Sequence, residues 1–381
     1  MRKTKTRRSK EVYEKYWNFT AGFTDIHSSN FITTLAIIRN YIDSHIKELK
    51  SVDVGTEEFS ELYTKLQDII IDYHQYDSKE SGTTVRKIIN TYVKIGFVKP
   101  GLRGYDERVN QFLLADDNKT RNRIFTTIFY DKSSISSSVT EDNTHLNHVK
   151  FLLNTIAHLP EGRHFSEDDL TGIMNMDITR YHKGFLNEEE LDKAYRYASI
   201  DNFKERKYNQ ISHLLSYLKK CIDIQYDPAK KELYILDDPE VKVDTRDISY
   251  ARDPYKHYIY RNELKEESLR IYGKIVCYAS KRQQKGLIAS HIKPSETCIK
   301  EGKSNQAYDY HNGILLSPEI DAYFDKSNIS FNDDGSLEIG DEVPPEMKEI
   351  FAHYSLDEPV LVSERIEYLH HRQELYRMQH S

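Results

Sequence analysis

Cysteine is scarce in this sequence of 381 residues. Its three cysteines, Cys221, Cys277 and Cys298, form no CxxC pair. This spacing excludes a disulfide framework and a zinc site built on paired cysteines. We therefore expect a protein of a reducing compartment that has no structural zinc.

Long hydrophobic runs are missing as well. No apolar stretch approaches the ~18 residues that a membrane-spanning helix needs, so no membrane association is expected. The start of the chain is basic but has no apolar core of the kind found in signal peptides. These absences predict a cytoplasmic protein. A glycine-rich Walker loop is also missing, which argues against ATP-driven translocation.

Positive charge is not in excess, because the formal net charge is −7. This value argues against a protein that binds nucleic acid through bulk electrostatic attraction alone. It leaves room for an enzyme that reads DNA sequence, since such proteins concentrate positive charge on one face. The basic residues do cluster in three segments, at 2–10, 119–123 and 204–207.

The hydrophobic patterns predict an α+β protein with a mostly helical N-terminal part. The predicted segments are a basic, disordered arm (1–10), a first helical module (11–130), a second module (131–240), a connector (241–262), a domain that carries the candidate chemistry (263–340) and a helical tail (341–381).

A helix is predicted within residues 83–114. Val85, Ile88, Ile89 and Val93 recur at helical spacing and form one apolar face. A basic loop rich in glycine follows at 96–104, where we expect a short strand. A helix followed by a basic β-loop resembles a winged helix-turn-helix, whose exposed helix enters the major groove of DNA. The polar face supplies the residues expected to contact DNA: Arg86, Lys87, Asn90 and Lys94.

The second module repeats this order. Ile211, Leu214 and Leu218 form an apolar stripe, and two alternating segments follow at 222–226 and 232–236. The DNA contacts expected from this helix are Asn209, Gln210 and His213. For both helices, an ordinary amphipathic helix with a solvated polar face remains the alternative interpretation.

The candidate chemistry begins at GLIASHIKP, residues 286–294. This segment predicts a strand with His291 near its end, which Pro294 terminates. About twenty residues later the sequence reads NGILLSPEIDAYFD, residues 312–325. Its Asn-Gly pair indicates a turn, and Pro318 suits the first turn of a helix. Asp321 and Asp325 are four residues apart and therefore share one helical face.

A further strand and a hairpin turn are predicted at 329–331 and 333–335. The whole order, a histidine strand, an Asn-Gly loop and a short acidic helix, resembles the HNH (ββα-metal) endonucleases. More narrowly, it resembles bacterial restriction-endonuclease-like members with the pattern SHIKP…NGxLLSP…D…FD.

This resemblance implies roles for individual residues. His291 would be the general base that activates a water molecule, and Asn312 would hold the loop that orients it. Asp321 and Asp325 would bind a divalent ion, with Asp321 in the place of the family's last histidine. Asp325 could instead be a hydrogen-bonding residue at the helix end. Ser290 stands where some members have a metal ligand.

The same resemblance implies the cofactor. Carboxylate oxygens favour Mg²⁺ or Mn²⁺ over zinc. Ser317 and Ile320 replace the cysteines of zinc-stapled members, so no structural zinc is expected. Lys293 could contact a DNA phosphate or could be an ordinary solvated lysine.

The sequence therefore predicts a metal-dependent endonuclease that hydrolyses double-stranded DNA, of the sequence-specific type II-like restriction kind. A homodimer is expected, since cutting both strands needs two active sites or two events. One alternative is a modification-dependent or other phage-defence nuclease. An alternative of another class is a DNA-binding regulator with an inactive HNH remnant, against which the intact His291 and Asn312 argue.

Overall fold

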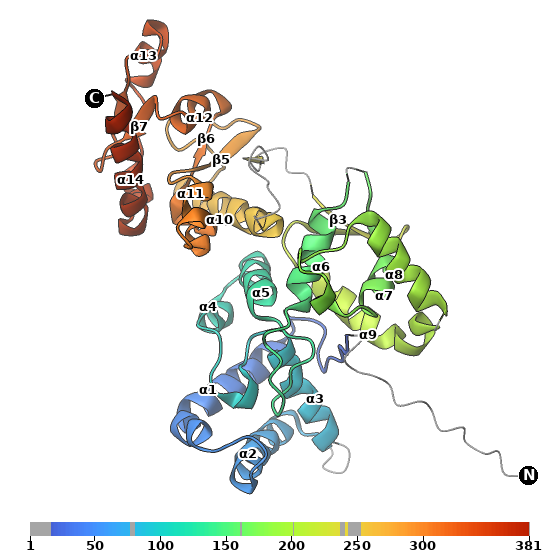
Figure 1. Ribbon diagram of the computed structural model, residues 1–381. Helices are drawn as coiled ribbons and strands as arrows, with labels where there is room; N and C mark the ends of the chain where they lie inside the picture. The colour runs from blue at the N-terminus through green and yellow to red at the C-terminus, as the bar shows by residue number, and fades with distance from the viewer. Residues whose placement is uncertain are drawn as a thin grey trace, which may run out of the picture. The chain divides into compact units, whose positions relative to one another are not determined.

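The computed structural model divides the chain into two compact units, with the boundary between Leu236 and Asp237 (Figure 1). We call them unit 1 and unit 2. The structure describes residues 17–76, 81–160, 162–200, 202–236, 241–242 and 253–380. The basic arm expected at 1–10 lies outside these residues. The protein is α+β and mostly helical, as predicted.

Unit 1 combines helices with one small sheet. Its elements are α1 (Ser29–Ser51), α2 (Glu57–His74), α3 (Ser81–Lys94), η2 (Pro100–Leu102), α4 (Arg108–Leu114), α5 (Asn118–Lys132), α6 (His148–Ala157), β1 (Phe165–Ser166), α7 (Glu167–Ile173), η3 (Ile178–Arg180), α8 (Glu188–Ile200), α9 (Phe203–Leu218), β2 (Ile224–Asp227) and β3 (Glu232–Ile235).

Local capping explains where several helices begin. The Thr56 side chain accepts a hydrogen bond from Phe59 N at the start of α2. At the start of α8, Glu190 N donates to Asn187 Oδ1, and Asn187 N donates to Glu190 Oε2. These bonds satisfy backbone N–H groups that a helix start would otherwise leave without partners.

The segment 17–23 connects the two expected modules of unit 1. Ala21 N donates to Nδ1 of His213 on α9 at 3.1 Å, and the next residue, Gly22, donates its N–H to Oγ1 of Thr91 on α3 at 2.9 Å. A Cβ atom on Gly22 would overlap the Ile88 side chain, so glycine permits this close approach. Side chains of α3 and α9 are therefore both hydrogen-bonded to the segment 17–23.

The hairpin predicted after α9 is present. Strands β2 and β3 pair antiparallel, and β1 adds to β3, so the sheet order is β1-β3-β2. The strand expected after α3 is reduced to an isolated bridge between Val98 and Tyr105, and η2 lies between these two residues. Apolar residues of this loop, such as Phe97 and Leu102, are fully buried, and the loop therefore belongs to the core.

Unit 2 is built around two short sheets. Its elements are β4 (Val241–Lys242), α10 (Pro254–Tyr272), β5 (Leu287–His291), α11 (Ser295–Lys300), η4 (Ser304–Tyr308), η5 (Tyr310–Asn312), β6 (Gly313–Leu316), α12 (Pro318–Asp325), β7 (Ile329–Phe331), β8 (Leu337–Ile339), α13 (Pro345–Phe351), η6 (Glu358–Val360) and α14 (Ser363–His380).

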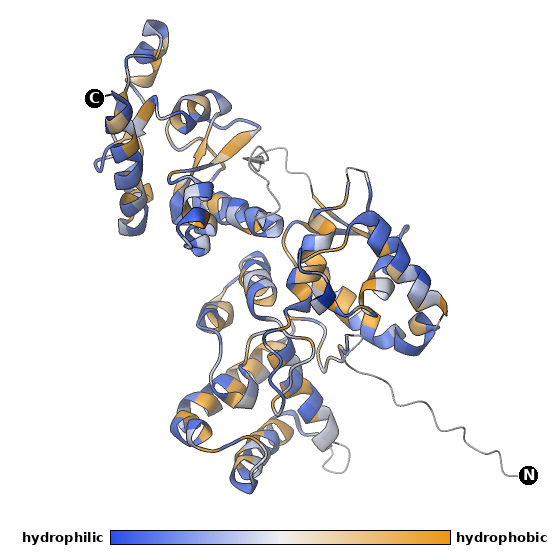
Figure 2. Ribbon diagram, viewed as in Figure 1, coloured by the Kyte–Doolittle hydropathy of each residue, from blue (hydrophilic) through white to orange (hydrophobic). Residues whose placement is uncertain are grey.

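The predicted ββα order is formed by β5, β6 and α12. Strand β5 pairs antiparallel with β6 and parallel with β4, and α12 packs on β5. Both β5 and β6 are largely apolar (Figure 2), and Leu287, Ile314 and Leu316 belong to the core of the unit. The strand and turn predicted at 329–335 form the β7–β8 hairpin, in which Gly335 has φ +82°.

Two helices of unit 2 lie across or beyond the expected catalytic domain, 263–340. Helix α10 begins within the expected connector, 241–262, and continues into the expected catalytic domain. The expected tail contains α14, whose Leu369 is part of the unit 2 core. No helix in the described part of the chain combines the length and the apolar character needed to cross a membrane.

Candidate active site

His291 is the last residue of β5, where it pairs with Gly313, the first residue of β6. Its Nε2 lies 3.0 Å from the carbonyl oxygen of Ala307. Since a carbonyl can only accept a hydrogen bond, this contact assigns a proton to Nε2. In the neutral ring the basic lone pair then resides on Nδ1.

The His291 ring also stacks on Tyr260 of α10. The ring centroids are 4.7 Å apart, and the planes differ by 2°. The Tyr260 hydroxyl donates to the carbonyl oxygens of Ser290 and Asn312 at 3.2 and 3.4 Å. Tyr260 therefore contacts both the imidazole ring and the two backbone segments that flank it.

Gly313 makes room for Tyr260. A Cβ atom at this position would overlap the Tyr260 hydroxyl and would lie 2.9 Å from a Leu264 methyl group. The backbone here is extended, with φ −141°, so left-handed geometry is not the reason for glycine. The Asn-Gly pair at 312–313 predicted a turn. Instead, Asn312 ends η5 and Gly313 begins β6, and glycine is required for close packing.

Asn312 holds the loops around His291. Its side chain is fully buried. The amide oxygen accepts from Lys293 N at 2.7 Å, and the amide nitrogen donates to Lys293 O at 3.0 Å and to Gln306 O at 2.9 Å. Ile292 N donates to the Asn312 carbonyl at 3.0 Å. This one side chain thus ties the segment after β5 to the segment before η5.

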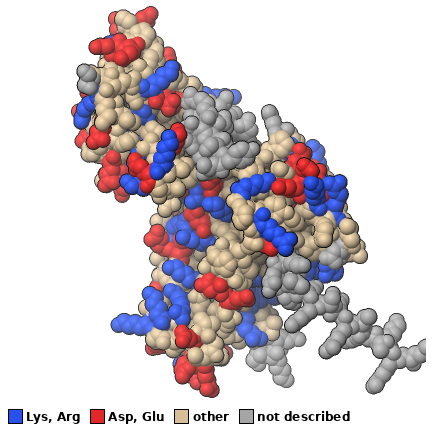
Figure 3. All heavy atoms as spheres, in the orientation of Figure 1, with Lys and Arg blue, Asp and Glu red and all other residues tan. Residues whose placement is uncertain are grey.

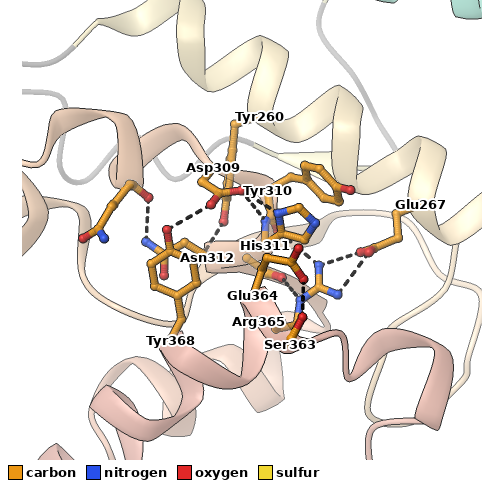
Figure 4. Close-up of polar contacts among 12 residues, drawn as sticks. Tyr260, Glu267, Asp309, Tyr310, His311, Asn312, Ser363, Glu364, Arg365 and Tyr368 are labelled. Atoms are coloured by element: carbon orange, nitrogen blue, oxygen red, sulfur yellow. Dashed lines mark hydrogen bonds and ion pairs between the residues drawn. The ribbon is translucent and has the colours of Figure 1, made fainter. Parts of the chain in front are cut away.

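The loop that leads to Asn312 is held from the other side by an acid. Asp309 accepts hydrogen bonds from the ring and the backbone N–H of His311 and from the Tyr368 hydroxyl (Figure 4). Burial raises the pKa of Asp309, but these hydrogen bonds outweigh it, so the net pKa is lowered. Asp309 is therefore held as the carboxylate.

Helix α12 presents the two candidate metal ligands differently. Asp321 is 5% exposed, whereas Asp325, one turn later, is exposed. Asp321 lies near enough to Tyr260 for its charge to add to the rise of the tyrosine pKa, which burial chiefly causes. The charge of Asp321 therefore acts on the tyrosine whose ring stacks on His291.

Two buried arginines of α14 support this arrangement. Arg372 donates to the carbonyl oxygens of His291 and Ile292, at 3.0 and 2.8 Å. Arg365 forms a two-pronged ion pair with Glu267 of α10, at 3.0 and 2.7 Å, and donates to Gly313 O at 3.0 Å (Figure 4). Residues from α10 and α14 therefore surround the ββα elements.

Helix α12 carries oxygen donors of the kind that bind a divalent ion. Among the described residues, no group of three His, Cys, Asp or Glu side chains could enclose a metal. Asp321 and Asp325 nevertheless offer two carboxylates on one helical face. Mg²⁺ is commonly held by one or two carboxylates together with waters and substrate phosphates. Asp321 and Asp325 therefore offer the donor type that such an ion prefers.

Lys293 does not extend into solvent. It is 8% exposed, and its ammonium group lies 2.6 Å from Glu301 Oε2. The interpretation of Lys293 as an ordinary solvated lysine is therefore wrong. A contact between Lys293 and a DNA phosphate stays a prediction.

The predicted DNA contacts of unit 1 fall into two groups. Arg86, Lys87 and Asn209 are exposed. Four residues are not open to solvent in the expected way, because they are bonded within the protein or largely buried. In this group, Asn90 accepts from Val139 N, Lys94 donates to Asn18 O, His213 accepts from Ala21 N, and the Gln210 side chain has a buried oxygen.

Lys94, which was predicted on an exposed polar face, is buried. It is 9% exposed, and burial lowers its pKa to about 8. Segment 17–23 covers this part of α3, so the polar face predicted from helical spacing is only partly a surface. Basic and acidic side chains are interspersed over the face drawn in Figure 3.

Sequence reasoning missed Tyr260, Glu267, Arg365 and Arg372. For the two arginines, a signal was present in the sequence of α14. Arg365, Leu369, Arg372 and Tyr376 follow helical spacing, so both arginines occupy the apolar face of α14. Charged residues at apolar-face positions predict buried, hydrogen-bonded groups.

Comparison with known proteins agrees with the ββα geometry. Residues 275–332 match the model of a family described as HNH endonuclease. The match covers β5 to β7, including His291, Asn312, Asp321 and Asp325. It supports a nuclease domain within unit 2. No curated protein matches the chain.

Proposed function

We propose that this protein is a metal-dependent endonuclease that hydrolyses phosphodiester bonds of double-stranded DNA in unit 2. The observation that carries the proposal is the environment of His291. Its ring is fixed by the Tyr260 stack and by the bond to Ala307 O, and its backbone is fixed through Asn312. A general base needs this kind of fixed orientation.

In this proposal the neutral His291 accepts a proton from a water molecule at Nδ1. The bond from Nε2 to Ala307 O sets the tautomer and stabilises the imidazolium that forms. Asn312 keeps the histidine-bearing segment in register with η5. The side chains that would hold a divalent ion are Asp321 and Asp325, with the Ser290 hydroxyl as a further oxygen. When bound, Mg²⁺ or Mn²⁺ would stabilise the charge that develops on the phosphate and the leaving oxygen.

Unit 1 is proposed to recognise the DNA duplex, which makes a sequence-specific restriction-type enzyme the favoured biological role. The support is the order of α9 followed by the β2–β3 hairpin, with β1 completing the sheet, which is the order of a winged helix. Exposed Arg86, Lys87 and Asn209 are the proposed contacts. A homodimer is proposed because duplex cutting needs two active sites.

Cleavage of supercoiled plasmid tests the proposal. Methylated and unmethylated plasmids are incubated with Mg²⁺, Mn²⁺ or EDTA, and the ends of any products are sequenced. We expect cutting with either ion and none with EDTA. His291→Ala should lower the rate by roughly 10²–10⁴-fold without changing DNA affinity. His353→Ala, at an exposed position of the same unit, is the matched control and should cut normally.

The remaining outcomes separate the alternatives. Cutting of methylated DNA alone would indicate a modification-dependent nuclease. Specific binding without any cutting would support a regulator with an inactive HNH remnant. Stoichiometric zinc in the purified protein, together with indifference to Mg²⁺, would contradict the proposed metal ligands.

A further inference from the structure

Arg372 connects the two halves of the candidate active site. It lies in α14, outside the residues that match the HNH family, and is 1% exposed. One side of its guanidinium donates to the carbonyl oxygens of His291 and Ile292 at the end of β5. Another nitrogen, Nη1, donates to Phe324 O and Ser327 Oγ at the end of α12, both at 3.1 Å.

We propose that Arg372 is a positioning residue that fixes the backbone of His291 relative to α12, the helix of Asp321 and Asp325. The proposal rests on the proposed nuclease function. Its consequence is that the distance between the base and the metal-binding carboxylates depends on a side chain 81 residues away from His291.

The shape of the guanidinium suits this role. It is planar, and its N–H groups point in fixed directions, so carbonyls bonded to it cannot move independently. Lysine places its three donors on a single nitrogen. A lysine at this position could bond one end of the site, but it could not bridge both in the same way.

Arg372 is also unlike an ordinary buried ion pair. Arg365, seven residues earlier on α14, is neutralised directly by Glu267. Among the described residues, Arg372 has no carboxylate within salt-bridge distance, and its direct partners are five neutral oxygens at the end of β5 and around the end of α12. The carboxylates of Asp325 and Asp321 act on it from farther away.

A buried arginine is an unfavourable choice if the side chain only fills space in the core. Burying a charge is unfavourable unless its hydrogen bonds are satisfied, and well-packed apolar residues often give equal or greater stability. The cationic group does suit the end of α12, because carbonyls at a helix C-terminus carry partial negative charge. A site-specific task therefore accounts for arginine better than packing does.

Gln373 provides a matched control on the same helix. It is 5% exposed, and its amide donates to Phe331 O at 3.0 Å and to Asp333 Oδ1 at 2.9 Å. Both partners belong to the β7 side of unit 2 rather than to β5 or α12. Gln373→Met removes buried hydrogen bonds of α14 without touching the His291 backbone.

The test compares Arg372→Met, Arg372→Lys and Gln373→Met in the 381-residue chain. Steady-state cleavage with Mg²⁺ gives kcat and KM, and DNA binding without metal gives Kd. Amide hydrogen exchange, followed by mass spectrometry, reports on the segment 287–293. We expect both Arg372 variants to lose about 10²-fold in kcat, with KM and Kd within about threefold of wild type. Their 287–293 segment should exchange faster.

Gln373→Met should keep kcat within about threefold and should leave exchange in 287–293 unchanged, even if its Tm falls. Normal kcat in Arg372→Met, or restoration of kcat by Arg372→Lys, would overturn the proposal. So would an equal loss of kcat in Gln373→Met, because helix docking alone would then explain the effect. If the wild type cuts no DNA, the proposed function fails, while the exchange data still decide whether Arg372 holds the His291 backbone.

Discussion

The imidazole of His291 lies flat against the phenol ring of Tyr260, with the centroids 4.7 Å apart. This stack joins the last residue of β5 to a helix that begins before the HNH match. It limits rotation of the imidazole about its side-chain bonds, while the Nε2 contact to Ala307 fixes which edge faces the protein. The orientation of the proposed base is therefore set by two independent contacts.

The first prediction separates the ring of Tyr260 from its hydroxyl. Tyr260→Phe keeps the stack but loses the bonds to Ser290 O and Asn312 O, so we expect a modest loss of kcat, of about threefold to tenfold. Tyr260→Leu removes the stack and should cost on the order of 10²-fold. Plasmid cleavage measures both rates, and thermal melting shows whether the variants are folded. Equal rates for the two variants would mean that the stack does not orient His291.

The second prediction concerns the close contact at Gly313. Gly313→Ala introduces a methyl group where the Tyr260 hydroxyl lies, so either the helix or the strand must shift. We expect a loss of about 1–3 kcal/mol in the free energy of unfolding, as is typical of overpacking, together with reduced cleavage. Adding the substitution Tyr260→Phe, which removes the overlapping hydroxyl, should recover part of the stability. Denaturant unfolding tests this coupling, and strictly additive effects would contradict it.

The third prediction compares two lysines of α3. Lys87 is exposed and Lys94 is buried against Asn18 O. We expect Lys87→Ala to weaken DNA binding and to reduce its salt dependence, because an exposed lysine that contacts phosphate releases a counterion. Lys94→Met should leave DNA binding unchanged. Titrations at several salt concentrations give both results, and a weakened Kd in Lys94→Met would restore Lys94 to the DNA-contacting face.

The fourth prediction concerns how Lys94 makes the free energy of unfolding depend on pH. Burial lowers its pKa from 10.5 to about 8, so between these two values the unfolded chain binds more protons than the folded protein. Stability contributed by this group therefore rises as the pH increases through that window. The difference in unfolding free energy between the wild type and Lys94→Met should rise with pH from about 8 to about 10.5. A pH-independent difference would show that Lys94 titrates normally.

The core of the candidate site could be predicted because its chemistry is nearly contiguous in sequence. His291 ends an apolar strand that a proline terminates, and Asp321 and Asp325 share a helical face by their spacing alone. Strand and helix periods are local properties, so they survive folding. The structure places these elements as β5, β6 and α12.

The surroundings of the site could not be predicted in the same way. Tyr260 and Arg372 reach His291 across long stretches of chain, and no local periodicity encodes such pairs. The helical spacing of Arg365 in α14 indicates burial, but its pairing with Glu267 depends on how α10 and α14 pack. For Lys94, local spacing gave the wrong prediction. Helical spacing places it on a polar face, but segment 17–23 covers that part of the helix.

The last prediction concerns the limits of the catalytic unit. The sequence placed the nuclease domain at 263–340, which excludes Tyr260, Arg365 and Arg372. The structure groups residues from Asp237 onward as one compact unit, and its core includes Tyr260 and Leu369. A fragment of 237–381 should therefore fold cooperatively and nick DNA weakly in Mg²⁺. Its sequence preference should be low, because base contacts carry specificity and the proposed reading helices are absent.

The shorter fragment, 263–340, should not fold. Without the first half of α10 and all of α14, it exposes apolar surface of β5 and β6 and leaves the carbonyl oxygens of His291 and Ile292 without their arginine. Circular dichroism melting and plasmid nicking compare the two fragments directly. A folded, active 263–340 fragment would show that the ββα elements are self-sufficient, and the orienting roles of Tyr260 and Arg372 would then be lost together. Full sequence specificity in the 237–381 fragment would instead move DNA recognition out of unit 1, leaving α3 and α9 as packing helices.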